Sequence, residues 1–138
     1  MPYLIDTDLI IDHLGNVPRA TELLARLAPE GVAISVVTYM EAWQGVLRSP
    51  APEDARQRFE VLLSALPVLP FSEAVARRTA HLREDLRRAG RNPRRRALDL
   101  MIAATALEHE FTLVTRYVGD YRDIPGLELH DADEPASS

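Results

Sequence analysis

The beginning of the chain places a short apolar run directly before an acid: Tyr3, Leu4 and Ile5 precede Asp6. The run predicts a buried strand with Asp6 as its last residue. In an open parallel sheet, ligands bind just beyond the carboxyl ends of the strands, so this strand could deliver a carboxylate into a site. A strand followed by an ordinary turn is the alternative, because Asp and Thr favour turns and helix caps.

Strand-like and helix-like segments alternate along the rest of the chain. Helical patterns cover residues 9–14, 18–28, 38–47, 52–66, 72–89 and 97–108, and strand patterns cover 32–37, 67–70, 111–114 and 127–129. This alternation predicts an α/β fold with a mostly parallel central sheet. We expect one domain over residues 1–130, with a basic loop at 91–96, a polar loop at 117–123 and a disordered tail at 131–138.

Composition excludes several kinds of chemistry. The chain has no cysteine, which excludes disulfides, thiolate metal sites and a cysteine nucleophile, and fits a reducing cytoplasm. No apolar run is long enough to span a bilayer, and no signal peptide is expected, so we expect no membrane partner. The net charge of −5 does not indicate nucleic-acid binding, yet all sixteen basic residues are arginine. Arginine suits bidentate phosphate contacts, although coding bias or thermal adaptation would also favour it.

Two further acids occupy the first turns of predicted helices. Glu41 follows Thr38 by three residues, which is a capping-box pattern and gives Glu41 a structural role as one alternative. Asp99 lies on a helix row whose next members are Ile102, Ala103 and Ala106. A partly buried carboxylate is costly unless it is paired or binds a cation, so Asp99 is a candidate functional residue.

Asp6, Glu41 and Asp99 belong to three separate strand–helix units that should meet at one edge of the sheet. Carboxylates held close together repel one another, and a cation relieves that repulsion. Hard oxygen ligands of this kind suit Mg²⁺ or Mn²⁺, which would activate a water molecule for attack on a phosphate. The four histidines show no zinc spacing, and the loop acids Asp120 and Asp123 mean little by themselves.

Four segments resemble the motifs of the PIN-domain family, and in particular its VapC-like toxins of toxin–antitoxin pairs. They are Asp6-Thr7-Asp8, the stretch 35–41, the stretch 97–106, and 113–116 followed by 124–127. The resemblance implies a three-layer α/β/α fold with a sheet of four to five strands. It implies a Mg²⁺- or Mn²⁺-dependent endoribonuclease with Asp6, Glu41 and Asp99 as its acidic site. It also implies a small antitoxin partner and a homodimer or a toxin–antitoxin hetero-oligomer.

The fourth motif departs from the family pattern. The family usually has Asn or Asp where this chain has Tyr117, and a tyrosine is a poor substitute for a hard oxygen ligand. Asp120, three residues further on, is the candidate replacement, or the fourth ligand is absent. The resemblance also implies that Thr115 lends a hydroxyl near the acids, and we expect Thr7 to shape the turn after Asp6.

In the mechanism that we expect, Asp6 and Asp99 hold the metal ion while Glu41 completes the cluster or orients the attacking water. The substrate would be an RNA, with a single-stranded loop favoured because duplex RNA hides its bases. The candidates for contacts with RNA phosphates are Arg94, Arg95, Arg96 and Arg116.

Two alternatives stay open. A haloacid-dehalogenase-type phosphatase would also place an Asp-x-Asp pattern at the first strand, but it usually needs a later lysine, which this chain lacks. A PIN-like fold that binds a partner without cleaving RNA is the other alternative, and Tyr117 favours it. An apolar strip formed by Tyr39, Met40, Trp43 and Val46 either packs in the core or forms part of a groove for an antitoxin helix.

Overall fold

The computed structural model describes residues 2–134. Its centre is a five-stranded, entirely parallel sheet with the strand order β3-β2-β1-β4-β5. The prediction of an α/β fold with a mostly parallel sheet of four to five strands is therefore confirmed. The strands are β1 (Tyr3–Ile5), β2 (Val32–Ser35), β3 (Val68–Leu69), β4 (Thr112–Thr115) and β5 (Leu129–Asp131).

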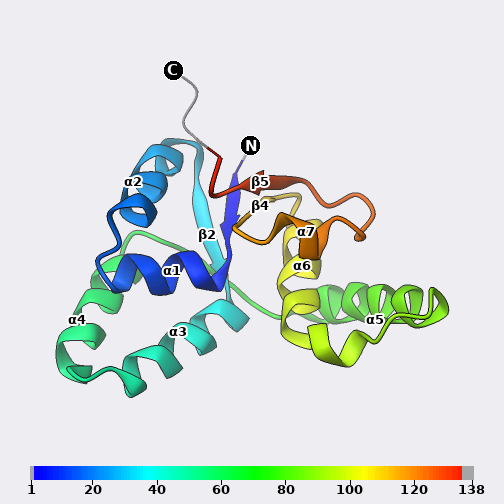
Figure 1. The fold of residues 1–138 in the computed structure, drawn as a ribbon, viewed down its shortest axis with the longest axis horizontal. Coiled ribbons are helices and arrows are strands. Elements are labelled where there is room, and N and C mark those ends of the chain that lie inside the picture. The colour runs from blue at the N-terminus through cyan, green and yellow to red at the C-terminus, as the bar shows by residue number, and fades with distance from the viewer. Residues whose placement is uncertain (1, 135–138) are drawn as a thin grey trace.

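Helices cover both faces of this sheet, as Figure 1 shows. The first four lie on one side, and α5 and α6 lie on the other. The helices are α1 (Thr7–Leu14), α2 (Pro18–Leu27), α3 (Val36–Arg48), α4 (Pro52–Leu63), α5 (Glu73–Arg88), α6 (Ala97–His109) and the single-turn α7 (Val118–Tyr121), with 3₁₀ turns η1 (Ala28–Glu30) and η2 (Pro93–Arg96). Among residues 2–134, no helix has the length and apolarity that crossing a membrane requires.

The two halves of the core follow from the alternation of side chains along β1. Leu4 faces a cluster that includes Leu100 and Ile102 of α6, whereas Ile5 faces a cluster that includes Ile10 of α1 and Phe59 of α4. Successive side chains of a strand point to opposite faces of a sheet, so a short central strand buried on both faces reads as continuously apolar. The three-layer α/β/α architecture follows from this arrangement.

The start of α3 corrects the predicted capping box. The strand pattern extends to residue 37, but β2 ends at Ser35, and Val36 and Val37 already belong to the helix. The Ser35 hydroxyl accepts a hydrogen bond from the backbone N–H of Thr38 at 3.1 Å and so acts as the N-cap. Thr38 is therefore not the cap, and the capping role predicted for Glu41 is wrong, which leaves the Glu41 carboxylate available for another partner.

Other elements also differ from prediction, and α4, for example, ends at Leu63 rather than at residue 66. The helix α1 begins at Thr7 rather than at residue 9, because Asp6 is its N-cap. The predicted polar loop at 117–123 contains α7. The last strand is shifted to Leu129–Asp131, since pairing with β4 begins where the N–H of Leu113 donates to the carbonyl of Glu128. The predicted tail is wrong at its start, because residue 131 ends this strand; its last part, 135–138, lies outside the described residues.

Candidate active site

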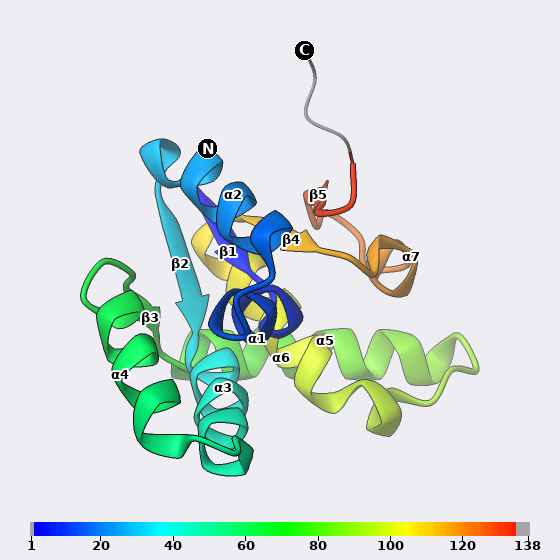
Figure 2. The same ribbon diagram turned by 60° about the vertical axis from the view of Figure 1, so that its left-hand side comes forward.

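The candidate site lies where β2, β1 and β4 end side by side, and Figure 2 shows β1 between its two neighbours. Each strand leads a polar side chain to this edge. Asp6 directly follows β1, Thr115 is the last residue of β4, and Glu41 lies in the helix that follows β2. Asp99 comes from the first turn of α6. Parallel strands place their carboxyl ends together, so this convergence is a consequence of the topology.

Asp6 is the most buried acid of the site, with 5% of its surface exposed. One carboxylate oxygen accepts a hydrogen bond from the N–H of Thr7 at 2.8 Å. The other accepts from the hydroxyl of Thr115 at 2.7 Å and from that of Tyr121 at 3.5 Å. Burial raises the pKa of Asp6 to about 6, although the hydrogen bonds from Thr115 and Thr7 act in the opposite direction, and the nearby Asp99 carboxylate adds to the rise.

Asp99 is half-buried and has an electrostatic environment similar to that of Asp6. Burial is the main reason that its pKa is raised, and the carboxylates of Asp120 and Asp8 add to this effect. A hydrogen bond from Tyr121 and the charge of Arg96 lower the pKa in part. Two acids with raised pKa values at one sheet edge are typical of a site that binds a cation or transfers protons.

Tyr121 connects these two acids. Its side chain is buried, its hydroxyl donates to Asp6 at 3.5 Å, and the hydroxyl is near enough to Asp99 to influence the pKa of that acid. Burial and the two carboxylates raise the pKa of Tyr121, so the phenol stays protonated and can donate to one of them at a time. The short helix α7 therefore places a hydroxyl between the acids of β1 and α6.

Glu41 is connected to the same edge through hydroxyl groups. The Thr7 hydroxyl donates to Glu41 Oε1 at 2.7 Å, and the Thr7 hydroxyl oxygen lies 3.0 Å from the hydroxyl oxygen of Thr38. Since Thr7 has only one hydroxyl proton, Thr38 must be the donor in the second bond. Ser35 in turn donates to Thr38 at 3.4 Å. Thr7 thus links Asp6, through its backbone N–H, to Glu41, through its side chain.

The oxygen donors of this site suit a hard divalent cation such as Mg²⁺ or Mn²⁺. Asp6 and the nearby Asp99 are the candidate direct ligands, and neither takes part in an ion pair among the described residues. Within residues 2–134, no three acidic or histidine side chains lie close enough to hold one ion together. Glu41 therefore suits a role through an intervening water.

The structure distinguishes Tyr117 and Asp120, the two candidate positions for the fourth ligand. The Tyr117 side chain is 48% exposed, and only its backbone N–H, which donates to the Thr115 hydroxyl at 3.1 Å, belongs to the site. Asp120 is exposed on α7, but its carboxylate is near enough to Asp99 to raise the pKa of that residue. Asp120 is thus the better candidate for a further acid at this edge.

The four candidate arginines fall into two pairs. Arg96 donates to both carboxylate oxygens of Asp123, at 2.7 and 2.9 Å, and also to the backbone carbonyl of Asp120. Arg116 forms ion pairs with Asp12 and Asp133. Both are therefore engaged with other parts of the protein. The remaining pair is exposed and takes part in no ion pair within residues 2–134; it consists of Arg94 and Arg95.

Sequence reasoning missed Tyr121, Thr38 and Ser35. The signal for Ser35 was present, since a serine at the end of an apolar strand is a strong helix cap. Tyr121 gave no comparable signal, because it stands in a stretch that looks like an exposed loop. A buried tyrosine hydroxyl needs a partner, but its burial follows only from the fold.

Comparisons with known proteins agree with this geometry. The chain is 29% identical to Ribonuclease VapC2 of Rickettsia felis, over 97% of this chain and 100% of that protein. It is also 29% identical to the tRNA(fMet)-specific endonuclease VapC of Shigella flexneri, over 95% and 98% of the two chains. The DNA-bound VapBC structure from Salmonella typhimurium superimposes with a TM-score of 0.83 at 30% identity, covering 96% of this chain and 98% of the other.

The family model described as the PIN domain matches residues 3–117, which is most of the chain and spans Asp6, Glu41, Asp99 and Thr115. The match covers the elements from β1 to β4 and leaves out only α7 and β5 among the described helices and strands. This chain belongs to the PIN-domain family.

Proposed function

We propose that the chain is the toxin of a VapBC-type toxin–antitoxin pair and acts as a metal-dependent endoribonuclease. The observation that carries this proposal is the buried Asp6 at the end of the central strand, with the Asp99 carboxylate near enough to raise its pKa. Its relatives are named ribonucleases, and its structural neighbours are toxin–antitoxin complexes.

Asp6 and Asp99 would hold the Mg²⁺ or Mn²⁺ ion. When bound, the ion supplies a water of lowered pKa and neutralises charge on the phosphate. The protein's own part is to fix the acids. Thr115 and the N–H of Thr7 hold both oxygens of Asp6 in place, so no reorganisation of this carboxylate is needed during the reaction.

Glu41 is the residue that we assign to the attacking water. Its position is set by the 2.7 Å hydrogen bond from Thr7, and its carboxylate lies in a half-buried environment. A carboxylate in hydrogen-bond reach of a water can orient it and accept its proton. Asp120 is exposed on α7, near enough to Asp99 to raise its pKa, and would serve as an additional acid or bind through water.

The substrate that we propose is a single-stranded segment of a structured RNA. The Shigella flexneri relative is named for its action on a tRNA, which is a structured RNA with single-stranded loops. Unpaired bases can be splayed out and read, whereas an RNA duplex hides its base edges in a deep, narrow groove. Arg94 and Arg95 are the exposed cations that we assign to RNA phosphates.

The partner that we propose is a small antitoxin, within a homodimer or a toxin–antitoxin hetero-oligomer. The Salmonella typhimurium neighbour is such a complex bound to DNA. An RNA substrate and the absence of cysteine fit a cytoplasmic location.

The test is cleavage of a structured RNA by purified, antitoxin-free protein with Mn²⁺ and with EDTA. We expect cleavage that EDTA abolishes and that Asp6→Asn and Asp99→Asn each reduce by at least about 100-fold. Asp85→Asn is the matched control, because Asp85 is an exposed acid on α5. Cleavage that persists in EDTA would contradict the metal mechanism.

A PIN-like fold that binds a partner without cleaving RNA is the second candidate function. The exposed Tyr117, at the position where the family usually has its fourth acidic or amide ligand, favours it. The same assay separates the two, since a binding module would cleave no RNA under any condition yet still bind the antitoxin. The phosphatase alternative does not fit, because the chain belongs to the PIN-domain family and has no lysine.

A further inference from the structure

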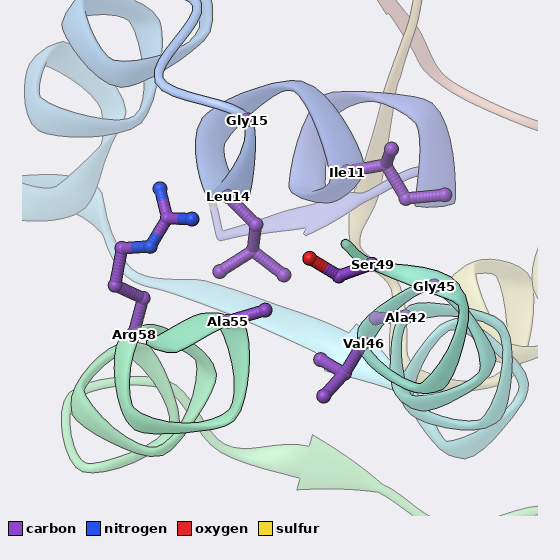
Figure 3. Close-up of a pocket in the computed structure, with 9 residues that line it drawn as sticks. All are labelled: Ile11, Leu14, Gly15, Ala42, Gly45, Val46, Ser49, Ala55 and Arg58. Atoms are coloured by element: carbon purple, nitrogen blue, oxygen red, sulfur yellow. The ribbon is translucent and has the colours of Figure 1, made fainter. Parts of the chain in front are cut away.

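The half-buried arginines Arg58 and Arg96 differ in how they relate to the acids of the candidate site. Arg58 extends from α4 toward α1 at the rim of an apolar cavity of about 200 Å³, which Figure 3 shows. None of the acids of the site lines this cavity, and the ion-pair partner of Arg58, Asp54, belongs to the same helix. Arg96 instead pairs with Asp123, which lies just after α7. This second pair joins two separate elements that both carry residues of the site.

Asp123 is the centre of a cluster of hydrogen-bonded ion pairs. Its carboxylate accepts two hydrogen bonds from Arg96, at 2.7 and 2.9 Å, and one from Arg91 at 2.6 Å. Arg96 also donates to the backbone carbonyl of Asp120, within α7. The side chains of Asp123 and Arg96 are only 19% and 20% exposed, so solvent screens their interaction less than that of a surface pair. We call Asp123, Arg96 and Arg91 the Asp123 cluster.

The Asp123 cluster ties α7 to the beginning of α6. Arg96 is the N-cap residue of α6, and Asp99 lies in the first turn of that helix. A single helical turn such as α7 fixes several residues for few backbone hydrogen bonds, so it depends on its surroundings for its position. The buried side chains of Tyr121 and Ile124 anchor α7 in the core, and Asp123 stands between them in the sequence. The cluster is therefore the polar anchor of α7.

The position of α7 decides whether Tyr121 reaches Asp6. The Tyr121 hydroxyl donates to Asp6 Oδ2 at 3.5 Å, which is at the upper limit of hydrogen-bond distances. A small outward displacement of α7 would break this bond. The Thr115 hydroxyl would then be the remaining side-chain donor to that oxygen among residues 2–134. The hydrogen bond between Tyr121 and Asp6 is thus sensitive to any loss of the polar anchor.

We propose that Asp123 is a positioning residue for Asp6: held by Arg96 and Arg91, it fixes α7 so that the Tyr121 hydroxyl orients the Asp6 carboxylate toward the metal ion. This inference rests on the proposed function for the identity of the ion and of the reaction. Asp123 contacts neither the ion nor the RNA and acts only through α7. Residues that orient the ligands of a metal ion typically contribute about 10–100-fold to metal affinity or activity.

A different role for Asp123 would be to present Arg91 and Arg96 to RNA phosphates. The geometry of Arg96 argues against this role, because both of its Nη atoms donate to groups within the protein. The two roles also predict different kinetics. Loss of a positioning residue lowers kcat and metal affinity, whereas a change in RNA contacts alters KM.

The test is a double-mutant cycle of Asp123→Asn and Tyr121→Phe. Isothermal titration calorimetry measures the Mn²⁺ affinity of the RNA-free protein, and RNA cleavage gives kcat and KM. Asp123→Asn should weaken Mn²⁺ binding and lower kcat by roughly tenfold each, while KM stays within about twofold of the wild-type value. Tyr121→Phe should cause losses of similar size. The double variant should lose little more than either single variant, because both changes break the same connection.

Arg96→Lys is the second variant, and it keeps the fold accessible if Asp123→Asn does not fold. A lysine retains the positive charge near Asp99 and the ion pair with Asp123, but it cannot make the bidentate pair and also reach the Asp120 carbonyl. It should weaken Mn²⁺ binding at least about threefold. Urea unfolding establishes that each variant is folded.

Glu108→Gln is the matched control. Glu108 accepts a hydrogen bond from Arg78 at 2.7 Å, and this ion pair joins α6 to α5 without an acid of the site. The control should change neither Mn²⁺ affinity nor kcat. Additive losses in the double variant, wild-type Mn²⁺ affinity in the folded Asp123 or Arg96 variants, or a change in KM alone would overturn the proposal. A wild-type protein that shows the coupling in Mn²⁺ affinity but cleaves no RNA would overturn the proposed enzymatic function and leave this inference standing.

Discussion

Asp6→Asn should stabilise the metal-free protein at neutral pH even though it removes a hydrogen-bonded residue. The pKa of Asp6 rises from its ordinary value of 3.8 to about 6 in the folded protein, mainly because of burial. A difference of about 2.2, at about 1.4 kcal/mol for each pKa unit, corresponds to about 3 kcal/mol. The side chain is almost completely buried, so solvent screening reduces this value little.

The direction of the effect follows from proton linkage. The folded-state pKa lies above the unfolded value, so the folded protein binds the proton more tightly. The resulting stability is fully present below about pH 3.8 and is lost as the pH rises through about 6. An asparagine has no such loss, but its single oxygen can keep only one of the two hydrogen bonds that Asp6 accepts from Thr115 and Thr7. That change costs about 1 kcal/mol.

The two contributions predict that the difference in stability between Asp6→Asn and the wild type changes sign with pH. Asp6→Asn should raise the free energy of unfolding by about 1–2 kcal/mol at pH 8 and lower it by about 1 kcal/mol near pH 4. Urea unfolding in EDTA between pH 4 and pH 8 measures this difference, with Asp85→Asn as the exposed control. A variant that is less stable than the wild type by the same amount at every pH would refute the reasoning, because Asp6 would then have an ordinary pKa.

Three further predictions test separate parts of the structure. Thr7→Val should reduce RNA cleavage by roughly tenfold or more, since Glu41 loses the hydrogen bond that orients it, while lowering the free energy of unfolding by only about 1 kcal/mol. Tyr121→Phe keeps the buried ring but removes the hydroxyl, whose hydrogen bond lowers the pKa of Asp99. The pKa of Asp99 should therefore rise, which a carbon-detected NMR titration in EDTA measures. An unchanged pKa would mean that the hydroxyl does not reach Asp99. Phe59→Ala should cost about 3–5 kcal/mol in urea unfolding, because Phe59 is 0% exposed.

The fold could be predicted to the level of layers and strand direction because hydrophobic periodicity carries that information. The buried strands near residues 3, 32 and 112 are short apolar or β-branched runs, and the helices between them have regular apolar faces. Boundaries were less accurate where a side chain overrides local propensity. Val36 and Val37 favour a strand, yet the Ser35 cap turns them into the first turn of α3.

The candidate site was predictable only in part, for a related reason. The topology of a parallel sheet brings the ends of its strands together, so the meeting of Asp6, Glu41 and Thr115 follows from the order of elements. How they are connected does not follow from it. The Thr7 bridge and the Tyr121 hydroxyl depend on rotamers and on the one-turn helix α7, which no sequence period marks.

The charges around the site explain why its acids favour a cation. Burial raises the pKa of Asp6 and of the half-buried Asp99, and neighbouring carboxylates add to both rises: those of Asp99 and Asp8 for Asp6, and those of Asp120 and Asp8 for Asp99. Arg96, whose charge lowers the pKa of Asp99 in part, donates its hydrogen bonds to Asp123 and to the backbone of α7. A bidentate pair of this kind holds α7 in place but supplies little positive charge to Asp6. A cation bound between these acids would remove their repulsion, and so the same uncompensated charge that destabilises the free protein would strengthen the binding of the ion.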